Sequence, residues 1–508
     1  MNEALIEQLR TLPDNLGGHV RLTLLAMLIG TTISIAIGLL ITRAVWLQGP
    51  VLGVVGVAQT IPSLALLALM VPLFGLFGFP AALVALVIYS MLPILRNTVT
   101  GIANVDAAVV EAARGVGMTQ NQMLWRVQLP LAAPVIIAGI RTATIWTVGT
   151  ATLATPIGAT SLGNYIFAGL QTRNNAAILV GCVCAALLSI TLDAIIRGLE
   201  LGARKRSRPL VLSMVAILGF IALASVAGPI AQSIRPTQGA VVRIGSKAFT
   251  EAYILAELTA LQVKRQTDYR PVLTPSLGSA VAFEALANGR IDTYVDYTGT
   301  IWTNVLKRET RAIGPQEMVR EMARVLPEQF GIEVVGTLGF ENAYCLAMPR
   351  ARADELGLKS IRDLKAVQHT LVLGTDMEFQ ARAEYRTMRD DHDLPFKRVR
   401  AMDSVLMYPA VVSGQVDVIS AYTTDGRIKA FDLAVLEDDL EMFPPYHAVI
   451  LAGSESLRRL PGLGPALRGI IDRIDEQAML QANWNVDQQH RSAADVAAEL
   501  LATFDENP

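Results

Sequence analysis

The side chains that most often perform covalent chemistry are sparse in this sequence of 508 residues and lie far apart. No serine, histidine and aspartate form a nucleophilic set, and no pair of carboxylates is spaced for acid–base catalysis. The phosphate loop Gly-x-x-x-x-Gly-Lys-Ser/Thr is missing, so the chain is not expected to hydrolyse ATP by itself. The five histidines are scattered: His19, His369, His392, His447 and His490. We therefore expect no catalytic residue, no bound metal and no cofactor.

The three cysteines also point away from a metal site or a disulfide. Cys182 and Cys184 lie in an apolar stretch, and Cys345 lies far along the chain. Two residues at positions i and i+2 point in different directions on a helix, and no further ligand cluster is near. We interpret all three as small packing residues.

The charges divide the chain into two halves of different character. Residues 1–239 carry 14 Lys and Arg against 7 Asp and Glu, whereas the remaining residues carry 29 against 38. The first half is therefore basic, poor in charge and rich in apolar runs, and the second is acidic. Such asymmetry predicts two environments for the two halves.

Six apolar stretches in the first half approach the roughly 20 residues that cross a bilayer as a helix. The short third stretch is bounded by Pro80 and Arg96. The stretches are 22–41, 49–74, 81–95, 131–153, 176–196 and 210–230. They predict an all-α membrane domain with several spans.

The basic residues of the short loops give this domain an orientation. Arg43, the segment with Arg96, Arg114 and Arg126, and the cluster at 204–208 are all expected on the cytoplasmic side. The three assignments agree if the N-terminus is outside. A sixth span then places everything after about residue 233 outside the membrane, and residues 235–240 read as a linker.

From Val241 onward short β-rich runs alternate with amphipathic helical stretches. Examples are the runs 241–245 and 371–374 and the helical stretches 251–264 and 315–326. This alternation predicts α/β units around a mainly parallel sheet. About 270 residues are enough for two lobes.

The loop at 106–130 has helical propensity, is interrupted by Gly115 and Gly117, and is expected to end at Pro130. Its sequence resembles the coupling motif of ABC importer permeases, in which this loop docks on the ATPase subunit. The resemblance implies six ATPase-coupling residues: Glu111, Ala112, Ala113, Gly117, Leu129 and Pro130.

Further stretches over about residues 15–200 resemble the quaternary-amine (glycine betaine/choline) permeases in particular. They are IPSL (61–64), LPILRN (92–97), GIRTA (139–143) and GATSLGNYI (158–166). The resemblance implies an ABC importer type I permease in the bacterial cytoplasmic (inner) membrane. Because the phosphate loop is missing, it also implies a separate ABC ATPase subunit as partner, with two copies of this chain forming the pathway and no nucleic acid bound.

The second half resembles the substrate-binding proteins of the same transporters along its whole length. The matching stretches are IGSKAFTE (244–251), YVDYTGT (294–300), YTTDGR (422–427) and FPPY (443–446). The implied fold is the α/β two-lobed periplasmic binding protein fold, located in the periplasm or the extracellular space. We expect a permease domain at 1–205, an extra span and linker at 206–240, and a binding domain at 241–508. Its lobe 1 would be 241–343 and 447–508, and its lobe 2 would be 344–446.

A quaternary ammonium group is cationic but has no N–H, so aromatic faces rather than hydrogen bonds must hold it. An acidic group at the other end of the ligand needs cationic donors and hydroxyls. The resemblance implies an aromatic cage of Tyr297, Tyr344, Tyr422 and Tyr446. It implies carboxylate ligands at Lys247, which precedes a helix expected to be N-capped by Thr250, and at Thr300 and Arg382.

One departure from the family concerns the first motif, where Ala252 replaces a common glutamine. A lost amide near the ligand would alter which group fits. Two cations, Lys247 and Arg382, favour a carboxylated betaine over choline. The candidates are glycine betaine, proline betaine, carnitine and choline, with ergothioneine or another amino-acid-like solute as the alternative.

Two other classes of protein remain open at this point. A betaine-sensing membrane receptor would need no ATPase-docking loop, which argues against it. A membrane enzyme acting on lipid or cell-wall precursors would need a catalytic set in the outer half, and the sequence offers none.

Overall fold

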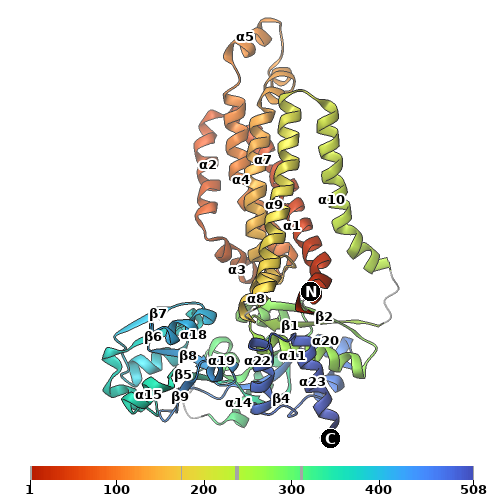
Figure 1. The fold of residues 1–508 in the computed structure, drawn as a ribbon. Helices are drawn as coiled ribbons and strands as arrows, with labels where there is room; N and C mark the ends of the chain where they lie inside the picture. The colour runs from red at the N-terminus through yellow and green to blue at the C-terminus, as the bar shows by residue number, and fades with distance from the viewer. Residues whose placement is uncertain (1–2, 173, 235–238, 309–312, 507–508) are drawn as a thin grey trace. The chain divides into compact units, whose positions relative to one another are not determined.

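The computed structural model describes residues 3–172, 174–234, 239–308 and 313–506. It divides into two compact units. One unit holds the helices of the first half, and the other holds two β-sheets with their helices (Figure 1). Most of the expected linker, residues 235–238, lies outside the described residues.

The first unit is all-α, as the sequence predicts. Within the described residues, five helices are long and apolar enough to cross a membrane, and a bent pair brings the number to six if it is counted as one span. α1, α4, α7 and α9 pack against one another at its centre. The bounds are α1 Glu3–Arg43, α2 Val45–Thr60, α3 Ser63–Phe74, α4 Phe79–Ala103, α5 Ala107–Gly115, α6 Gln120–Met123, α7 Leu129–Ala151, α8 Gly163–Gln171, α9 Asn175–Arg204 and α10 Arg208–Ile234.

The expected span at 49–74 is wrong as a single straight helix. The chain bends by 88° between α2 and α3. Pro62 forces the preceding residue Ile61 into an extended conformation with ψ of 126°. The hydroxyl of Tyr89 on α4 donates to the carbonyl oxygen of Ile61, and Gln59 donates to the Tyr89 carbonyl at 2.7 Å. Tyr89 on α4 therefore provides hydrogen-bond partners for the chain at this bend.

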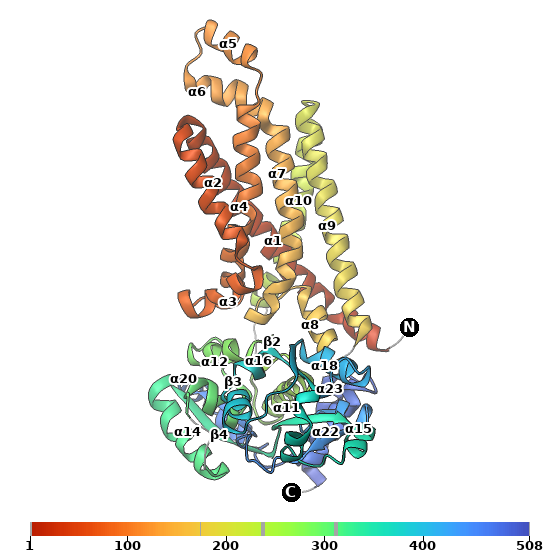
Figure 2. The same ribbon diagram turned by 90° about the vertical axis from the view of Figure 1, so that its left-hand side faces the viewer.

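The basic turns of this unit gather at one end of the helix bundle. The loop with α5 and α6 and the turn between α9 and α10 lie at that end in both views (Figures 1 and 2). Arg43 at the end of α1 donates to Asn121 in the same loop at 2.6 Å. By the positive-inside rule this end is cytoplasmic, and the opposite end, where α1 begins, is outside.

The second unit has two lobes, each built on a five-stranded sheet. The sheet orders are β2-β1-β3-β10-β4 and β7-β6-β8-β5-β9. The chain leaves the first sheet between β4 and β5 and returns between β9 and β10. The strands are β1 Val241–Lys247, β2 Arg270–Leu277, β3 Thr293–Tyr297, β4 Ile332–Glu341, β5 Tyr344–Pro349, β6 Val372–Thr375, β7 Arg398–Ala401, β8 Val418–Tyr422, β9 Leu433–Leu436 and β10 His447–Gly453.

Helices cover the sheets of both lobes. In lobe 1 they are α11 Thr250–Gln266, α12 Ser279–Ala287, α13 Thr298–Thr300, α14 Pro315–Phe330, α20 Ser454–Arg459, α21 Leu463–Arg468, α22 Glu476–Asp487 and α23 Ala493–Glu506. In lobe 2 they are α15 Arg350–Leu356, α16 Met377–Ala381, α17 Ala383–Arg386, α18 Ser404–Val412 and α19 Gly426–Ala430.

The prediction of a mainly parallel sheet is wrong. β1 pairs in parallel with β3, and β6 with β7 and β8, but β10 and β5 run antiparallel to both of their neighbours. The reason is the pair of crossings. β5 and β10 each enter a sheet at the end where β8 and β3 finish, so they must run in the opposite direction.

Candidate functional site

The register of the two sheets brings the four predicted tyrosines to the ends where the lobes meet. Tyr344 at the start of β5 pairs with Tyr422 at the end of β8. Tyr297 at the end of β3 pairs with Ala448 on β10, and Tyr446 directly precedes β10. The carboxyl ends of strands in α/β sheets are the usual place for ligands.

Three of these tyrosines and two phenylalanines form one group of rings, the aromatic cluster. The ring centroid of Tyr344 lies 4.6 Å from that of Tyr422 and 5.8 Å from that of Tyr446, the latter edge-on at 77°. Phe379 and Phe443 lie at 5.0 and 6.5 Å from the same ring. The Tyr422 hydroxyl donates to that of Tyr344 at 2.7 Å.

Arg382 inserts its guanidinium into this aromatic cluster. Its Cζ atom lies 4.9 Å from the ring centroid of Tyr344 and 5.8 Å from that of Tyr446. The side chain is buried, and its Nη2 donates to Glu378 at 2.6 Å and to Thr300 at 3.3 Å. In the described part of the chain its Nε has no hydrogen-bond partner. A cation thus already rests on the faces of these rings.

Tyr446 is held on both sides of its hydroxyl. It donates to the fully buried Glu384 and accepts from Arg382 at 3.0 Å. Burial raises the pKa of Tyr446 well above its usual value, although the Arg382 guanidinium opposes this, so the phenol stays neutral. Its ring packs on Gly299, where a Cβ would meet the ring at 2.7 Å. Only a residue without a side chain allows this approach.

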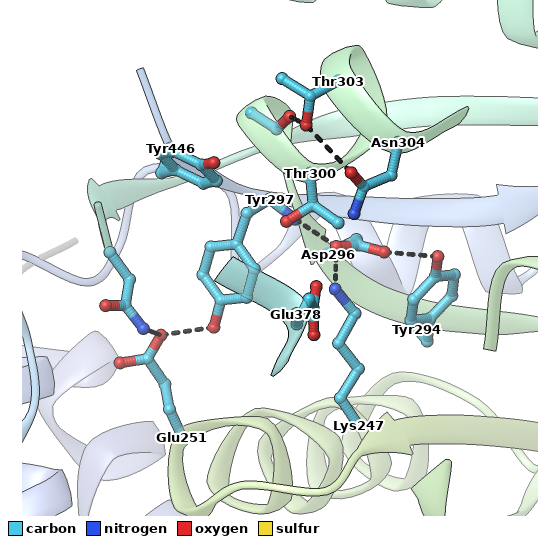
Figure 3. A network of polar contacts seen from close by, with 12 residues as sticks. Lys247, Glu251, Tyr294, Asp296, Tyr297, Thr300, Thr303, Asn304, Glu378 and Tyr446 are labelled. Atoms are coloured by element: carbon cyan, nitrogen blue, oxygen red, sulfur yellow. Dashed lines mark hydrogen bonds and ion pairs between the residues drawn. The ribbon is translucent and has the colours of Figure 1, made fainter. Parts of the chain in front are cut away.

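The remaining predicted residues, Tyr297 and Lys247, form a neighbouring group (Figure 3). Lys247 is buried and ion-paired with Asp296, which also accepts from the Tyr294 hydroxyl at 2.6 Å. The Lys247 Nζ lies 5.6 Å from the ring centroid of Tyr297. The Tyr297 hydroxyl donates to Glu251 at 2.5 Å.

Burial raises the pKa of Glu251, and hydrogen bonds donated by neighbouring side chains partly oppose it. Thr250 is not the N-cap of α11, contrary to expectation. The cap position is Phe249, and the Thr250 hydroxyl instead donates to Asp487 at 2.6 Å.

The structure therefore brings Tyr344, Tyr422, Tyr446, Thr300 and Arg382 into contact and places Tyr297 with Lys247. Both predicted cations already have carboxylate partners, which sequence reasoning did not foresee. The residues it missed are Glu251, Asp296, Phe379, Glu378, Glu384 and Phe443. Only Asp296 carried a sequence signal, as the one acidic residue within the strand Thr293–Tyr297.

The candidate coupling loop is built from two short helices around a left-handed glycine. Asp106 caps α5 by accepting from the Ala108 N–H at 2.9 Å. Glu111 and Ala112 on α5 are exposed, whereas Ala113 is buried. Gly117 has φ of 82°, a region that favours glycine, and lets the chain turn into α6.

Leu129 and Pro130 begin α7, so the loop ends where the sequence predicts. Helical structure continues from α6 through a π-helical turn, Leu124–Gln128, into α7. The wider turn accommodates the missing N–H of the proline. Val116 and Trp125 expose large apolar side chains in this loop, 75% and 60% accessible.

Comparison with known protein families matches each half separately. Residues 240–503 match the substrate binding domain of ABC-type glycine betaine transport systems. Residues 30–205 match the inner membrane component of binding-protein-dependent transport systems. The two matches fall on the sheet-containing and helical units described above.

Individual relatives cover one half or both. The ergothioneine transport permease/ergothioneine binding protein of Helicobacter pylori is 30% identical over 83% of this chain and 77% of its own length. The choline transport system permease protein of Bacillus subtilis is 45% identical over 36% of this chain and 83% of its own. The glycine-betaine-binding protein of Pseudomonas aeruginosa is 34% identical over 52% of this chain and 88% of its own.

The matches, the membrane helices and the two-lobed outer unit agree with one another. The chain is a multi-pass inner-membrane permease whose binding unit faces outward. It therefore belongs to the ABC importer family, and it joins the inner-membrane transport component and the glycine betaine-type substrate-binding domain in one polypeptide.

Proposed function

We propose that this importer subunit captures a betaine-type quaternary amine outside the cell and passes it through its own membrane half. The candidates are glycine betaine, proline betaine, carnitine and choline. The observation that carries the proposal is the guanidinium of Arg382 on the faces of Tyr344 and Tyr446, at 4.9 and 5.8 Å from the ring centroids.

The chemistry of the aromatic cluster suits such a ligand. A trimethylammonium group has no hydrogen to donate, and each ring face offers it about 0.5–2 kcal/mol when water is excluded. Tyr344 and Tyr446 are both buried and meet at nearly a right angle, so they present two walls of a box. The same faces hold the guanidinium of Arg382, so the ligand cation and Arg382 would compete for them.

The polar end of the ligand would face Lys247, Thr300 and Arg382. Because Lys247 pairs with Asp296 and Arg382 with Glu378, neither cation is uncompensated. The preference for a carboxylated ligand that two free cations would impose is thereby weakened. Choline and the carboxylated betaines stand as equal candidates.

Ergothioneine is the second candidate, and one observation favours it. The Helicobacter pylori relative also joins a permease and a binding protein, and its name describes it as an ergothioneine transporter. The match covers 83% of the present chain. Ergothioneine is itself a betaine, of a thiolated histidine, so the aromatic cluster would hold its trimethylammonium group in the same way.

The energy for transport would come from ATP hydrolysis by a separate ABC ATPase subunit that docks on the loop at 106–130. The exposed Val116 and Trp125 support docking, since apolar side chains of this size on a cytoplasmic loop gain by being covered. Two copies of this chain would form the pathway. A receptor without an ATPase would have no use for this surface.

Calorimetric titration of the isolated binding half, residues 240–508, tests the proposal. The panel is glycine betaine, proline betaine, carnitine, choline and ergothioneine. Binding of one of the first four in the micromolar range supports the main proposal, and binding of ergothioneine alone supports the second. If none binds below millimolar concentration, both are wrong.

A further inference from the structure

One buried carboxylate lies at the meeting point of the two lobes. Glu251, in the first turn of α11, is fully buried and accepts four hydrogen bonds. Its Oε1 accepts from the Tyr297 hydroxyl at 2.5 Å and from Asn342 Nδ2 at 3.0 Å. Its Oε2 accepts from the Thr424 hydroxyl at 2.6 Å and from Asn483 Nδ2 at 2.9 Å. An ionised carboxylate can accept all four.

The four donors come from different parts of the binding unit. Tyr297 and Asn483 belong to lobe 1, Asn342 lies at the first crossing, and Thr424 follows β8 in lobe 2. Asn483 also donates to the carbonyl oxygen of Thr424 at 3.0 Å. Two bonds thus run between lobe 1 and Thr424 of lobe 2.

The same carboxylate is connected to two tyrosines of the candidate site. It holds the hydroxyl of Tyr297 directly. Its partner Asn342 donates its backbone N–H to the carbonyl oxygen of Tyr446 at 3.0 Å. Glu251 therefore joins the ring of Tyr297 in lobe 1 to the bond that Thr424 makes from lobe 2.

We infer that Glu251 is a positioning residue that latches the closed lobes through Thr424 and fixes the ring of Tyr297 at the same time. This role of Glu251 adds to the proposed function. It rests on that function in one respect, which is that the lobes close around the ligand. Because a ligand leaves after the lobes open, the bond between Thr424 and Glu251 slows ligand release and leaves capture by the open form unchanged.

The test uses the full-length chain in lipid nanodiscs, with Thr424→Val, Thr424→Ser and, as control, Thr259→Val. The Thr259 hydroxyl is equally buried but, among the described residues, donates within its own helix only, to the carbonyl oxygen of Leu255. Release of radiolabelled choline and glycine betaine is timed. Hydrogen bonds to buried charges are strong enough that Thr424→Val should speed release about 10- to 100-fold, with association changed less than about twofold. Thr424→Ser should restore slow release.

A second measurement needs no ligand. Spin labels at Gln329→Cys in lobe 1 and Asp354→Cys in lobe 2, both exposed positions, report the closed fraction after Cys182 and Cys184 are changed to serine. Thr424→Val and Glu251→Gln should each lower this fraction, and Thr259→Val should not. An unchanged closed fraction and release rate in Thr424→Val overturns the latch. A lowered closed fraction without binding of any quaternary amine leaves the latch in place and overturns the proposed ligand.

Discussion

Tyr344 and Tyr422 stand directly opposite each other on β5 and β8, and their hydroxyl groups share a hydrogen bond of 2.7 Å. Their ring centroids are 4.6 Å apart. Tyr344 is also the first residue of the strand that enters lobe 2, so the crossing between the lobes and one wall of the aromatic cluster are set by the same residue. Changes to this pair should therefore affect ligand affinity.

Replacement of Tyr422 by alanine should discriminate between kinds of amine. The loss of one ring face is expected to weaken choline or glycine betaine about 30-fold, and a primary amine such as ethanolamine less than about threefold. Tyr422→Phe keeps the face and should stay near wild type. Calorimetry on the three proteins provides the comparison, and equal losses for both amines would show that the ring does not recognise the quaternary group.

Replacement of Arg382 by glutamine should separate the two roles of this residue. The variant no longer places a cation on Tyr344 and Tyr446, so choline should bind as well as or better than in wild type. A ligand carboxylate would lose a charged donor, and glycine betaine should weaken about 10-fold or more. Thr303→Val, which removes a 3.4 Å contact to Arg382 and local bonds to Gly299 and Asn304 but leaves the guanidinium in place, serves as control. Parallel losses of both ligands would contradict the competition between Arg382 and the ligand.

The loop at 106–130 should be dispensable for binding and required for uptake. Glu111→Arg combined with Gly117→Trp places a bulky side chain at a φ of 82° and reverses an exposed charge. Uptake into cells should fall at least about 10-fold if coupling depends on this geometry, while ligand affinity stays unchanged. Normal uptake by the double variant would show that the ATPase does not dock here.

The stability of the binding half should depend on pH through Asp425. Burial raises the pKa of this carboxyl, but the guanidinium of Arg427, at 2.5 Å, and hydrogen bonds outweigh it, and the pKa lies below its ordinary value of 3.8. The ionised Asp425 carboxylate therefore contributes fully to the free energy of unfolding above pH 3.8, and this contribution is lost as the pH falls through the lowered pKa. Thermal unfolding of residues 240–508 should show this acid loss.

Asp425→Asn should remove that part of the acid dependence and cost about 3 kcal/mol at pH 7, because Arg427 is left buried without its partner. Glu355→Gln removes an exposed pair with Arg352 and should change little. An acid dependence in Asp425→Asn identical to that of wild type would contradict this role of the pair.

The features that sequence reasoning predicted were those that local patterns carry. The length of the apolar stretches identified the membrane helices. The sequence motifs located the tyrosines that the sheets then bring to one edge. The bend at Pro62 and the antiparallel course of β5 and β10 were missed, because a bend needs a partner such as Tyr89 and strand direction depends on where the chain crosses. The partners of Glu251 and Arg382 were not foreseen, for a related reason. Which charge meets which partner is decided by residues far apart in sequence, such as Thr424 and Glu378.

The aromatic cluster is proposed to recognise a positive charge, and two isosteres that lack this charge test the proposal most directly. Affinities of the binding half would be measured for choline against 3,3-dimethylbutanol and for glycine betaine against 3,3-dimethylbutanoate, in which carbon replaces the quaternary nitrogen. With two or three ring faces contributing, the quaternary ligand should bind about 100-fold more tightly than its isostere. Equal affinities within either pair that binds would contradict the account.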